Sequence, residues 1–297
     1  MLNLERLRVL EAVSATGSVR GAADTLHVTT SAVSQQLGRL EREIGQKLLE
    51  RNGRGIRLTE ADTVLAAHAR RLLDQVERIE ADLAERQGAV AGRLTIGAFA
   101  TAARSLLPDA LRRLRAEHPG LEVRMSEYEP TDAIPLVRRA DLDIAVVQDW
   151  PAAPLVLPDG LCRQSLLDDP FDVALPADHP LATRETVTLP DLSTIDWISW
   201  TPGQICHDWL RQTLAELGTS PTIAHTASDH STQLALVGAG MGAAIIPRLG
   251  RDPVPSTVRI VPIHPVPTRH VYAVWRTTAD RRPAIRVAVD TLRAVTG

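Results

Sequence analysis

The sequence predicts an α/β protein with an all-α, winged N-terminal head, and three observations lead to this fold class. Short amphipathic helices followed by a hairpin signal occupy residues 1–58. One long heptad pattern covers residues 59–88. Strand and helix patterns then alternate over residues 92–297, as in α/β domains with a mostly parallel sheet. A length of 297 residues fits two or three folded parts.

Composition and charge favour a globular chain with a basic head. The apolar content of 44% and charged content of 23% are ordinary for a folded protein. Residues 1–58 carry nine Arg or Lys and six Asp or Glu, a net +3, so the remainder of this −3 chain carries −6. A basic head on an acidic body fits a head that contacts phosphate.

No stretch of the sequence predicts a membrane segment. The longest uncharged run, residues 231–247, has 17 residues and is too polar to span a bilayer, which needs about 20 mostly apolar residues. The N-terminus carries no apolar signal segment. We therefore expect a cytoplasmic protein without a membrane partner.

Residues 29–44 predict a helix suited to read duplex DNA. Its apolar residues recur at spacings of 4, 3 and 4 on one stripe: Val33, Leu37, Leu40 and Ile44. The opposite face offers hydroxyl, amide and guanidinium groups, which suit base edges and phosphates. The expected DNA contacts of this helix are Thr30, Ser31, Ser34, Gln35 and Arg39. An ordinary amphipathic surface helix is the alternative, but Gly38 leaves room for a close backbone approach.

Two shorter helices precede this one and a hairpin follows it. The first begins at Leu4 and stops at Gly17, and the second follows Ser18 and ends at Leu26, as in a helix-turn-helix. Asn52-Gly53 between short apolar pieces predicts a hairpin turn. The rim of this hairpin carries three arginines, which we interpret as a basic wing on DNA: Arg51, Arg54 and Arg57. A solvated basic hairpin is the alternative.

A long charged helix is expected from residue 59, with Thr59 as its cap. Its apolar residues alternate by 4 and 3 for nearly three heptads: Leu65, Ala69, Leu72, Val76, Ile79 and Leu83. The other faces are strongly charged, so this narrow seam needs a partner helix. We expect a second copy of the chain, giving a homodimer and, as the larger assembly, a homotetramer; packing on the chain's own body is the alternative.

The body shows a strand and helix rhythm after the short link at residues 88–92. The expected strands are 94–97, 121–127, 142–147, 171–175, 197–200, 222–225, 243–246 and 271–276. The expected helices are 105–118, 134–139, 207–217, 234–237 and 283–295.

Nothing in the sequence predicts an enzyme, a metal site or a cofactor. Cys162 and Cys206 do not make a disulfide framework. Cys206-His207 invites a thiol nucleophile and its base, but adjacent residues of a helix point about 100° apart and cannot pair directly. The sequence has no metal-ligand spacing and no glycine-rich phosphate loop.

The sequence resembles the LysR-type family of bacterial transcriptional regulators. In the head the matching residues are Gly17-Ser18, Ala22-Ala23, Leu26-His27-Val28, residues 31–36, Leu40-Glu41, Gly45, Leu48, Glu50-Arg51 and Leu58-Thr59. Weaker motifs of the body are residues 92–97, 142–145, 178–181 and 237–242. Thr30 stands where members often have Gln, which leaves the base preference open. Leu49 stands where they often have Phe, which only removes part of a core contact.

This resemblance implies a winged helix-turn-helix over residues 1–58, a dimerising linker helix over 59–88 and an effector-binding regulatory domain over 92–297. The last is expected to resemble a two-lobed periplasmic binding protein. Lobe one is placed at residues 92–161 and 268–297 and lobe two at 162–267, with crossings near Leu161 and Pro267. The implied function is a DNA-binding regulator controlled by a small molecule bound between the lobes.

Family analogy puts the effector at loops that follow strands and at helix starts: Thr101, Ala102, Gln148, Trp200, Thr201 and Asp229. Free backbone N–H groups before a helix at Ser105, with the Thr101 hydroxyl, can hold a carboxylate or phosphate. We therefore expect a small anionic or zwitterionic metabolite. An ordinary capped loop is the alternative at each position.

A redox-sensing regulator using Cys206 is the alternative function. Cys206 precedes a predicted helix, where a thiolate is favoured, and some relatives sense peroxide with a cysteine in that region. Such sensors need a resolving cysteine, but position 215 is Ala215 and Cys162 belongs to another segment. A solute-binding protein would share the body, but not the head, and would need an export signal.

Overall fold

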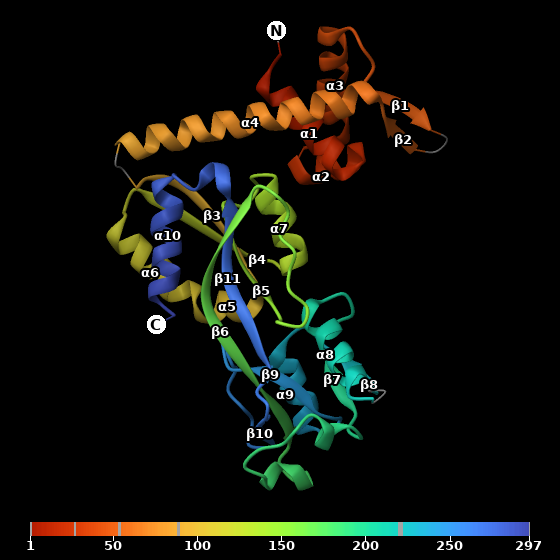
Figure 1. The fold of residues 1–297 in the computed structure, drawn as a ribbon, viewed down its shortest axis with the longest axis vertical. Coiled ribbons are helices and arrows are strands. Elements are labelled where there is room, and N and C mark those ends of the chain that lie inside the picture. The colour runs from red at the N-terminus through yellow and green to blue at the C-terminus, as the bar shows by residue number, and fades with distance from the viewer. Residues whose placement is uncertain (1, 27, 53–54, 88–89, 219–221, 297) are drawn as a thin grey trace. The chain divides into compact units, whose positions relative to one another are not determined.

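The computed structural model describes residues 2–26, 28–52, 55–87, 90–218 and 222–296. These residues fold into two compact units, divided at Gly88 (Figure 1). In these ranges the model contains no helix with the length and apolar character that a bilayer crossing requires.

The first unit begins with three helices, α1 (Leu4–Thr16), α2 (Val19–Leu26) and α3 (Thr30–Ile44). Local sequence sets their ends. The Asn3 side chain accepts a hydrogen bond from the Glu5 N–H at 2.8 Å, and Thr29 caps α3 in the same way through Ala32 at 3.2 Å. The residues after α1 and α3 are glycines in the left-handed conformation. The helices expected for the head are confirmed.

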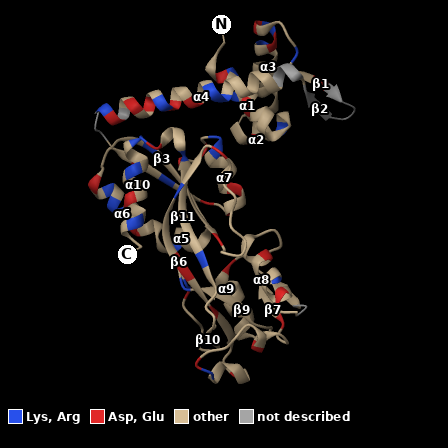
Figure 2. Cartoon of the chain, viewed as in Figure 1, with Lys and Arg blue, Asp and Glu red and all other residues tan. Residues whose placement is uncertain are grey.

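A hairpin and a long helix complete this unit: β1 (Leu49–Asn52), β2 (Gly55–Leu58) and α4 (Glu60–Gln87). Asn52 pairs with Gly55 in the antiparallel ladder, so the expected hairpin is present although Asn52 belongs to the strand. Gly53 and Arg54 lie outside the described residues. The three helices, the base of the hairpin and the start of α4 share one core, which includes Leu10, Val33, Leu40, Leu48 and Ala66. Figure 2 shows acidic and basic residues interspersed along α4.

The second unit has two lobes that share β6 (Leu161–Pro176). Lobe one contains β3 (Gly92–Ala98), α5 (Ala100–Ser105), α6 (Leu107–Glu117), β4 (Leu121–Glu127), α7 (Pro130–Arg138), β5 (Ile144–Asp149), β11 (Thr268–Arg276) and α10 (Pro283–Ala294). Lobe two contains β7 (Trp197–Ser199), α8 (Ile205–Glu216), β8 (Ile223–Thr226), α9 (His230–Gly238), β9 (Ala244–Pro247) and β10 (Val258–Pro262). Short 3-10 turns occupy Pro180–Thr183, Pro190–Leu192 and Thr277–Ala279.

In each lobe, apolar clusters cover both faces of the sheet. In lobe one, α5, α6 and α10 pack on one face of the sheet and α7 on the other. In lobe two, α8 and α9 lie against separate clusters on either side of β6 and β9. All six residues of β5 are buried, which explains its nearly continuous apolar sequence.

The sheet is mixed, so the expectation of a mostly parallel sheet was wrong. The strand order is β10-β6-β11-β5-β3-β4, with β9 also paired to β6. Only β3 pairs in parallel with its neighbours β4 and β5 in this sheet, whereas β11 runs antiparallel to both β5 and β6. The chain enters lobe two along β6 and returns along β11, and two adjacent connecting strands of opposite direction are antiparallel by necessity.

The first crossing between the lobes lies near Pro170, and the expected crossing near Leu161 was wrong. Residues 161–170 of β6 pair with β11 in lobe one, and residues 171–176 pair with β9 and β10 in lobe two. The expected strand at 171–175 is therefore the second half of a strand of 16 residues. Mixed polar and apolar residues in its first half concealed this length. Strand β10 was not expected at all.

The expected helix at 105–118 is two helices, α5 and α6, and the first begins at Ala100. Pro108 explains the break, because it fits the first turn of α6 and is disfavoured within a continuous helix. Helix α7 also starts four residues before its expected position at Ile134.

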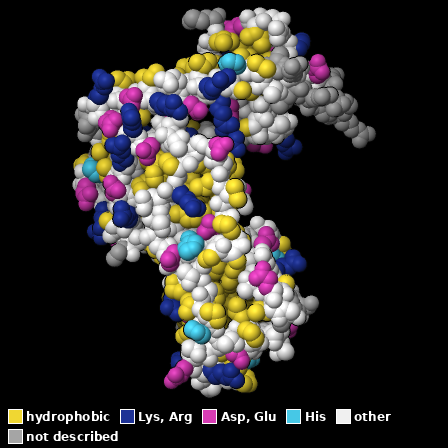
Figure 3. All heavy atoms as spheres, viewed as in Figure 1, with side chains coloured by type: hydrophobic (Ala, Val, Ile, Leu, Met, Phe, Trp, Pro, Cys, Tyr) yellow, Lys and Arg dark blue, Asp and Glu magenta, His cyan; other side chains and the backbone are white. Residues whose placement is uncertain are grey.

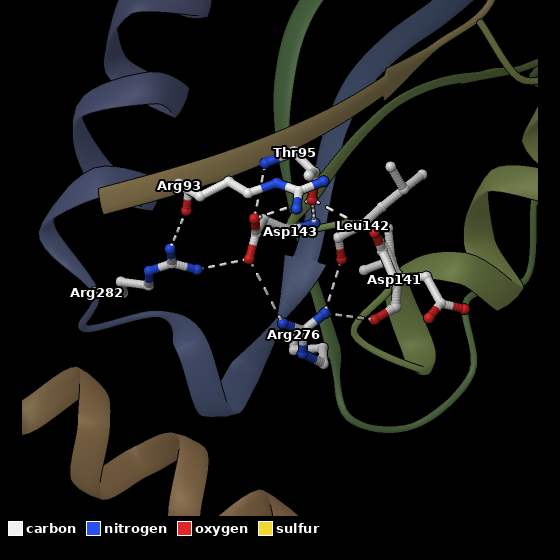
Figure 4. Close-up of polar contacts among 8 residues, drawn as sticks. Arg93, Thr95, Asp141, Leu142, Asp143, Arg276 and Arg282 are labelled. Carbon is white, nitrogen blue, oxygen red and sulfur yellow. Dashed lines mark hydrogen bonds and ion pairs between the residues drawn. The ribbon is translucent and has the colours of Figure 1, made fainter. Parts of the chain in front are cut away.

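A partly buried carboxylate, Asp143, ties the strand ends of lobe one together (Figure 4). Asp143 accepts hydrogen bonds from the Thr95 N–H at 2.7 Å, the Thr95 hydroxyl at 3.0 Å and the Arg282 Nη1 at 2.6 Å. Arg276 donates to the carbonyl oxygens of Val137 and Leu142 at 2.6 and 2.8 Å. These bonds compensate for burial of the charges and fix β3, β5 and α10 to the end of β11.

We predict that Gly242→Ala destabilises lobe two. Gly242 has φ 141°, and an added Cβ would lie 2.4 Å from the backbone oxygen of Asp196. The free energy of unfolding of the second unit should fall by about 2–4 kcal/mol in urea titrations followed by tryptophan fluorescence. Gly38→Ala, whose Cβ meets no heavy atom within 4 Å, is the control. Equal unfolding midpoints of wild type and Gly242→Ala would contradict this account.

Candidate functional site

Helix α3 separates its apolar stripe from its polar face. Val33, Leu37 and Leu40 are buried in the core of the head. The predicted DNA contacts Thr30, Ser31, Ser34, Gln35 and Arg39 are all exposed. Ser34 donates to the Thr30 carbonyl at 2.9 Å, whereas Gln35 and Arg39 make no hydrogen bond within the described chain. The exposed face therefore presents an amide and a guanidinium that are available to a partner.

Gly38 interrupts this face with bare backbone. An added Cβ would meet nothing within 4 Å in the described part of the chain, so no neighbouring helix requires this glycine. A glycine inside a helix costs roughly 0.5–1 kcal/mol relative to alanine. The position therefore favours a close approach from outside the chain.

An open groove of about 300 Å³ lies between the start of α1 and the end of α3. It is lined by Arg6, Arg39, Arg42 and Glu43, which gives it an excess of positive charge. Arg6 forms an ion pair with Glu43, and this hydrogen bond holds the pKa of Glu43 below its ordinary value. Arg6, which lies on α1, was not expected from the sequence, and Arg42 was not among the predicted DNA contacts although it shares the polar face of α3 with Arg39.

The wing is anchored to α3 through Glu41. Its carboxylate accepts the Leu48 N–H at 2.9 Å and lies 3.1 Å from Lys47 Nζ. Burial alone would raise the pKa of Glu41, but these bonds outweigh it and lower the pKa. Among the predicted wing contacts, Arg51 and Arg57 lie in described strands without a described side chain, and Arg54 lies outside the described residues. Their DNA contacts stay predictions.

The heptad seam of α4 divides into two parts. Leu65 packs on the core of the head and Ala69 is fully buried, so the chain itself covers the start of the seam. Leu72, Ile79 and Leu83 are 48, 50 and 55% exposed. Figure 3 shows hydrophobic side chains along this edge of α4. The head of the same chain therefore covers the start of the seam, whereas Leu72, Ile79 and Leu83 remain exposed.

A small cavity lies between the two lobes of the second unit. Its volume is about 20 Å³, enough for about one water molecule. Lobe one supplies Phe99, Ala100, Thr101, Glu129, Gln148 and Arg269, and lobe two supplies Trp200, Gln204, Cys206, Ser228 and His230. Cys206 Sγ lies 3.6 Å from Gln148 Nε2, so the lobes touch across the cavity.

Arg269 is the central cation of this cavity and is only 2% exposed. It lies directly opposite Asp169 on β6, with Nε and Nη2 at 2.9 and 2.7 Å from one carboxylate oxygen. Nη2 also donates to the Thr101 hydroxyl at 2.7 Å, and Nη1 donates to the Gln148 side-chain oxygen. The rings of Phe99 and Phe171 lie 4.8 and 4.9 Å from the guanidinium carbon. These contacts hold the guanidinium rigidly at the cavity wall.

Three predicted effector residues line the cavity: Thr101, Gln148 and Trp200. The other three do not. Ala102 is fully buried in the lobe-one core, because α5 begins at Ala100 and turns this residue inward. The Thr201 hydroxyl is bonded to Ser228 at 2.7 Å, and Asp229 caps α9 by accepting from the Thr232 N–H at 3.0 Å. The expected anion site before a helix at Ser105 is likewise corrected, since α5 already occupies that segment.

Arg269, Glu129 and His230 were not predicted from the sequence. A signal did exist for Arg269, which stands beside the strand predicted at 271–276 and would be costly to bury without a partner. Its partner Asp169 fell in a segment that was not recognised as a strand. Glu129 and His230 begin helices, where polar residues are ordinary, so nothing in the sequence distinguished them.

Burial dominates the ionisation of the cavity groups. It raises the pKa of Glu129, and it raises the pKa of Cys206 to about 12 even though Arg269 acts in the opposite direction. Burial, followed by the charge of Arg269, lowers the pKa of His230 to about 3. At neutral pH the cavity therefore holds a neutral thiol and a neutral imidazole.

Comparisons with known proteins assign both parts of the chain to the same family. Residues 4–61 match the family model described as bacterial regulatory helix-turn-helix protein, lysR family, and residues 87–297 match the model of the LysR substrate binding domain. LrrA of Synechococcus elongatus, named a "Probable HTH-type transcriptional regulator", is 30% identical over 98% of this chain and 97% of its own.

Two further comparisons, one with a sequence and one with a solved structure, also span nearly the whole chain. A "Hydrogen peroxide-inducible genes activator" of Dickeya chrysanthemi is 28% identical over 98% of this chain and 95% of its own. A full-length OxyR variant of Pseudomonas aeruginosa superposes with a TM-score of 0.68, and all of both chains is covered. At 24% identity this structure supports the fold alone.

We predict that His230 makes the second unit sensitive to acid. Its pKa of about 3 in the fold lies below the 6.5 of the free side chain, so the unfolded chain binds the proton first as the pH falls. From pH 7 to pH 5 the wild type should lose about 2 kcal/mol more unfolding free energy than His230→Gln. Urea titrations at both pH values measure this, with the exposed His225→Gln as the control. Parallel losses in wild type and His230→Gln would rule the effect out.

Proposed function

Because the chain belongs to the LysR family of bacterial transcriptional regulators, we propose a specific division of labour among its described residues. The protein is a DNA-binding transcriptional regulator with an effector-binding domain. In our proposal the exposed face of α3 reads the operator, and the interlobe cavity around Arg269 holds the effector. The observation that supports the effector site is the buried guanidinium of Arg269, which is bonded to Thr101 and Gln148 at the cavity wall.

On DNA, we assign Gln35 to base contacts and Arg39 to phosphate contacts. Gln35 is an exposed amide near the start of α3, and an amide can make two hydrogen bonds to the major-groove edge of adenine. Arg39 lies one turn later in the basic groove with Arg6 and Arg42, where a phosphate would find an excess of positive charge. Thr30, Ser31 and Ser34 supply further hydroxyls on the same face.

For the effector, the proposal is a small anionic or zwitterionic metabolite. Thr101 accepts from Arg269, which leaves its own hydroxyl hydrogen for a ligand oxygen. Phe99 and Trp200 add apolar walls. Since the cavity has room for about one water, a metabolite can enter only if the lobes separate or the lining side chains move. Effector binding is thereby coupled to the distance between the lobes.

For assembly, the proposal is a homodimer that is joined through α4 and can pair further into a homotetramer. Leu72, Ile79 and Leu83 are about half exposed on one helix face, and Val76 lies between them in the heptad. A pairing helix of a second copy would bury this seam. Two heads on one assembly would also bind two operator half-sites.

We further propose that the chain has no catalytic activity and acts in the cytoplasm, where bacterial DNA is found. The relatives compared above are named as regulators of transcription or gene activators. The neighbouring Cys206 and His207 do not act as a nucleophile and base, because His207 Nδ1 is bonded to the Trp200 carbonyl at 2.8 Å.

Redox sensing through Cys206 is less well supported than effector binding. In its favour, Cys206 lines the cavity, and one relative is named a hydrogen peroxide-inducible activator. Against it, the pKa of about 12 keeps the thiol protonated, and the thiolate is the reactive form. Cys162, whose pKa is raised to about 11, lies opposite Trp275 at the start of β6 and donates to its carbonyl. It is therefore poorly placed to resolve an oxidised Cys206.

We predict that Arg39→Ala and Gln35→Ala affect DNA binding differently. Arg39→Ala should weaken binding to every sequence and reduce the salt slope of the affinity by about one, because one phosphate contact is lost. Gln35→Ala should relax the preference at one base pair, at a cost of about 1–3 kcal/mol on the operator only. Fluorescence anisotropy with operator and scrambled duplexes at several salt concentrations separates the two. Identical profiles for both variants would contradict the assignment.

We predict that Ile79→Glu prevents pairing through α4. A carboxylate at a half-exposed seam position would be desolvated without a partner in the paired helices, so the subunit equilibrium should shift toward the monomer. Analytical ultracentrifugation measures the mass, and Glu80→Gln on the exposed side is the control. If Ile79→Glu sediments as wild type does, the seam is not the interface.

A further inference from the structure

One carboxylate of the interlobe cavity has no partner. Glu129 is the N-cap residue of α7, but its side chain makes no capping hydrogen bond. It lines the cavity, and in the described part of the chain it forms no ion pair or hydrogen bond. Burial raises the pKa of Glu129, and the charge of Arg269 offsets this cost only in part. Its position needs an explanation that the fold does not provide.

The charge balance of the cavity disfavours a simple anion. Arg269 is neutralised by Asp169, which is itself 1% exposed and also accepts the Leu249 N–H at 2.8 Å. His230 is neutral at physiological pH, and the nearby Arg104 is ion-paired with Asp252. Glu129 is therefore the one lining charge without an opposite charge among these groups. A ligand that carried only negative charge would add to this excess.

A second observation indicates that a polar ligand belongs here. His230 is 5% exposed, and its Nε2 has no hydrogen-bond partner although the side chain lines the cavity. An imidazole nitrogen buried in this way costs free energy unless a ligand or water pairs with it. The cavity thus combines an unused carboxylate and an unused imidazole nitrogen with the donors of Thr101 and Gln148.

On the basis of the proposed effector function, we infer that the effector is a small amino-acid zwitterion, with its ammonium against Glu129 and its carboxylate toward Arg269 and Thr101. The ammonium supplies the counter-charge that Glu129 lacks. The carboxylate accepts hydrogen bonds from the Thr101 hydroxyl and from the Arg269 guanidinium. To make this contact, Arg269 replaces its hydrogen bond to Gln148 with one to the ligand. Because a zwitterion has no net charge, it gives Glu129 a cationic partner without adding to the negative excess of the cavity, as an anion would.

The test begins with the full-length protein and a set of matched compounds. Thermal unfolding is measured with each standard L-amino acid. For each stabilising amino acid it is repeated with the matching carboxylic acid that lacks the amino group and the matching amine that lacks the carboxylate. We expect at least one amino acid to raise the Tm, and its two truncated analogues to leave the Tm unchanged.

Calorimetry on variants then locates the ammonium. Glu129→Gln keeps the shape but removes the charge, and it should weaken binding of the amino acid by about 30-fold or more. Glu117→Gln is the control, because Glu117 is exposed at the end of α6 and does not line this cavity, and it should change the Kd by less than about two-fold. Thr101→Val should weaken binding irrespective of the amino group.

The outcomes separate this inference from the proposed function. If a carboxylic acid without an amino group binds as tightly, depends on Thr101 and is indifferent to Glu129→Gln, the zwitterion is wrong but the cavity remains the effector site. If an amino acid binds equally well to Thr101→Val and Glu129→Gln, both proposals fail. A panel in which no amino acid raises the Tm also overturns the inference.

Discussion

The pairing of Arg269 with Asp169 is the interaction on which the regulatory unit depends. These residues lie opposite each other on β11 and β6, where the two strands cross between the lobes. A buried guanidinium without its carboxylate would be strongly destabilising, so the pair requires these strands to stay in register. The same guanidinium then fixes Thr101 and Gln148 at the cavity wall. One ion pair thus links the path of the chain to the shape of the binding site.

The sequence predicted the head more completely than the body. Local signals determine the head: caps at Asn3 and Thr29, left-handed glycines, and a stripe of Val33, Leu37 and Leu40 that is buried as expected. In the body, most helices and strands were found, but the topology was not. The first half of β6 is mixed in polarity, and its pairing with β11 joins residues about one hundred positions apart. Pairing at such separation leaves no local pattern.

The proposed effector site shows the same limit. Thr101, Gln148 and Trp200, which line the cavity, were predicted because they were expected to follow strands or begin helices. Arg269 and Glu129 were missed because a charged residue is ordinary in a sequence, and only burial makes it exceptional. Burial is a property of the tertiary structure, which depends on distant segments. Charge balance within a cavity can therefore be judged only after the fold is known.

The continuous course of β6 through both lobes has a mechanical consequence. Because one hydrogen-bonded strand belongs to both sheets, the lobes cannot slide past each other without breaking a ladder. They can only bend or twist about the segment near Pro170 and its neighbour Pro267. A ligand that separates the lobes slightly near this pivot therefore produces a larger displacement at the tips of both lobes. Effector binding would then reach distant parts of the regulator as a rotation of one lobe relative to the other.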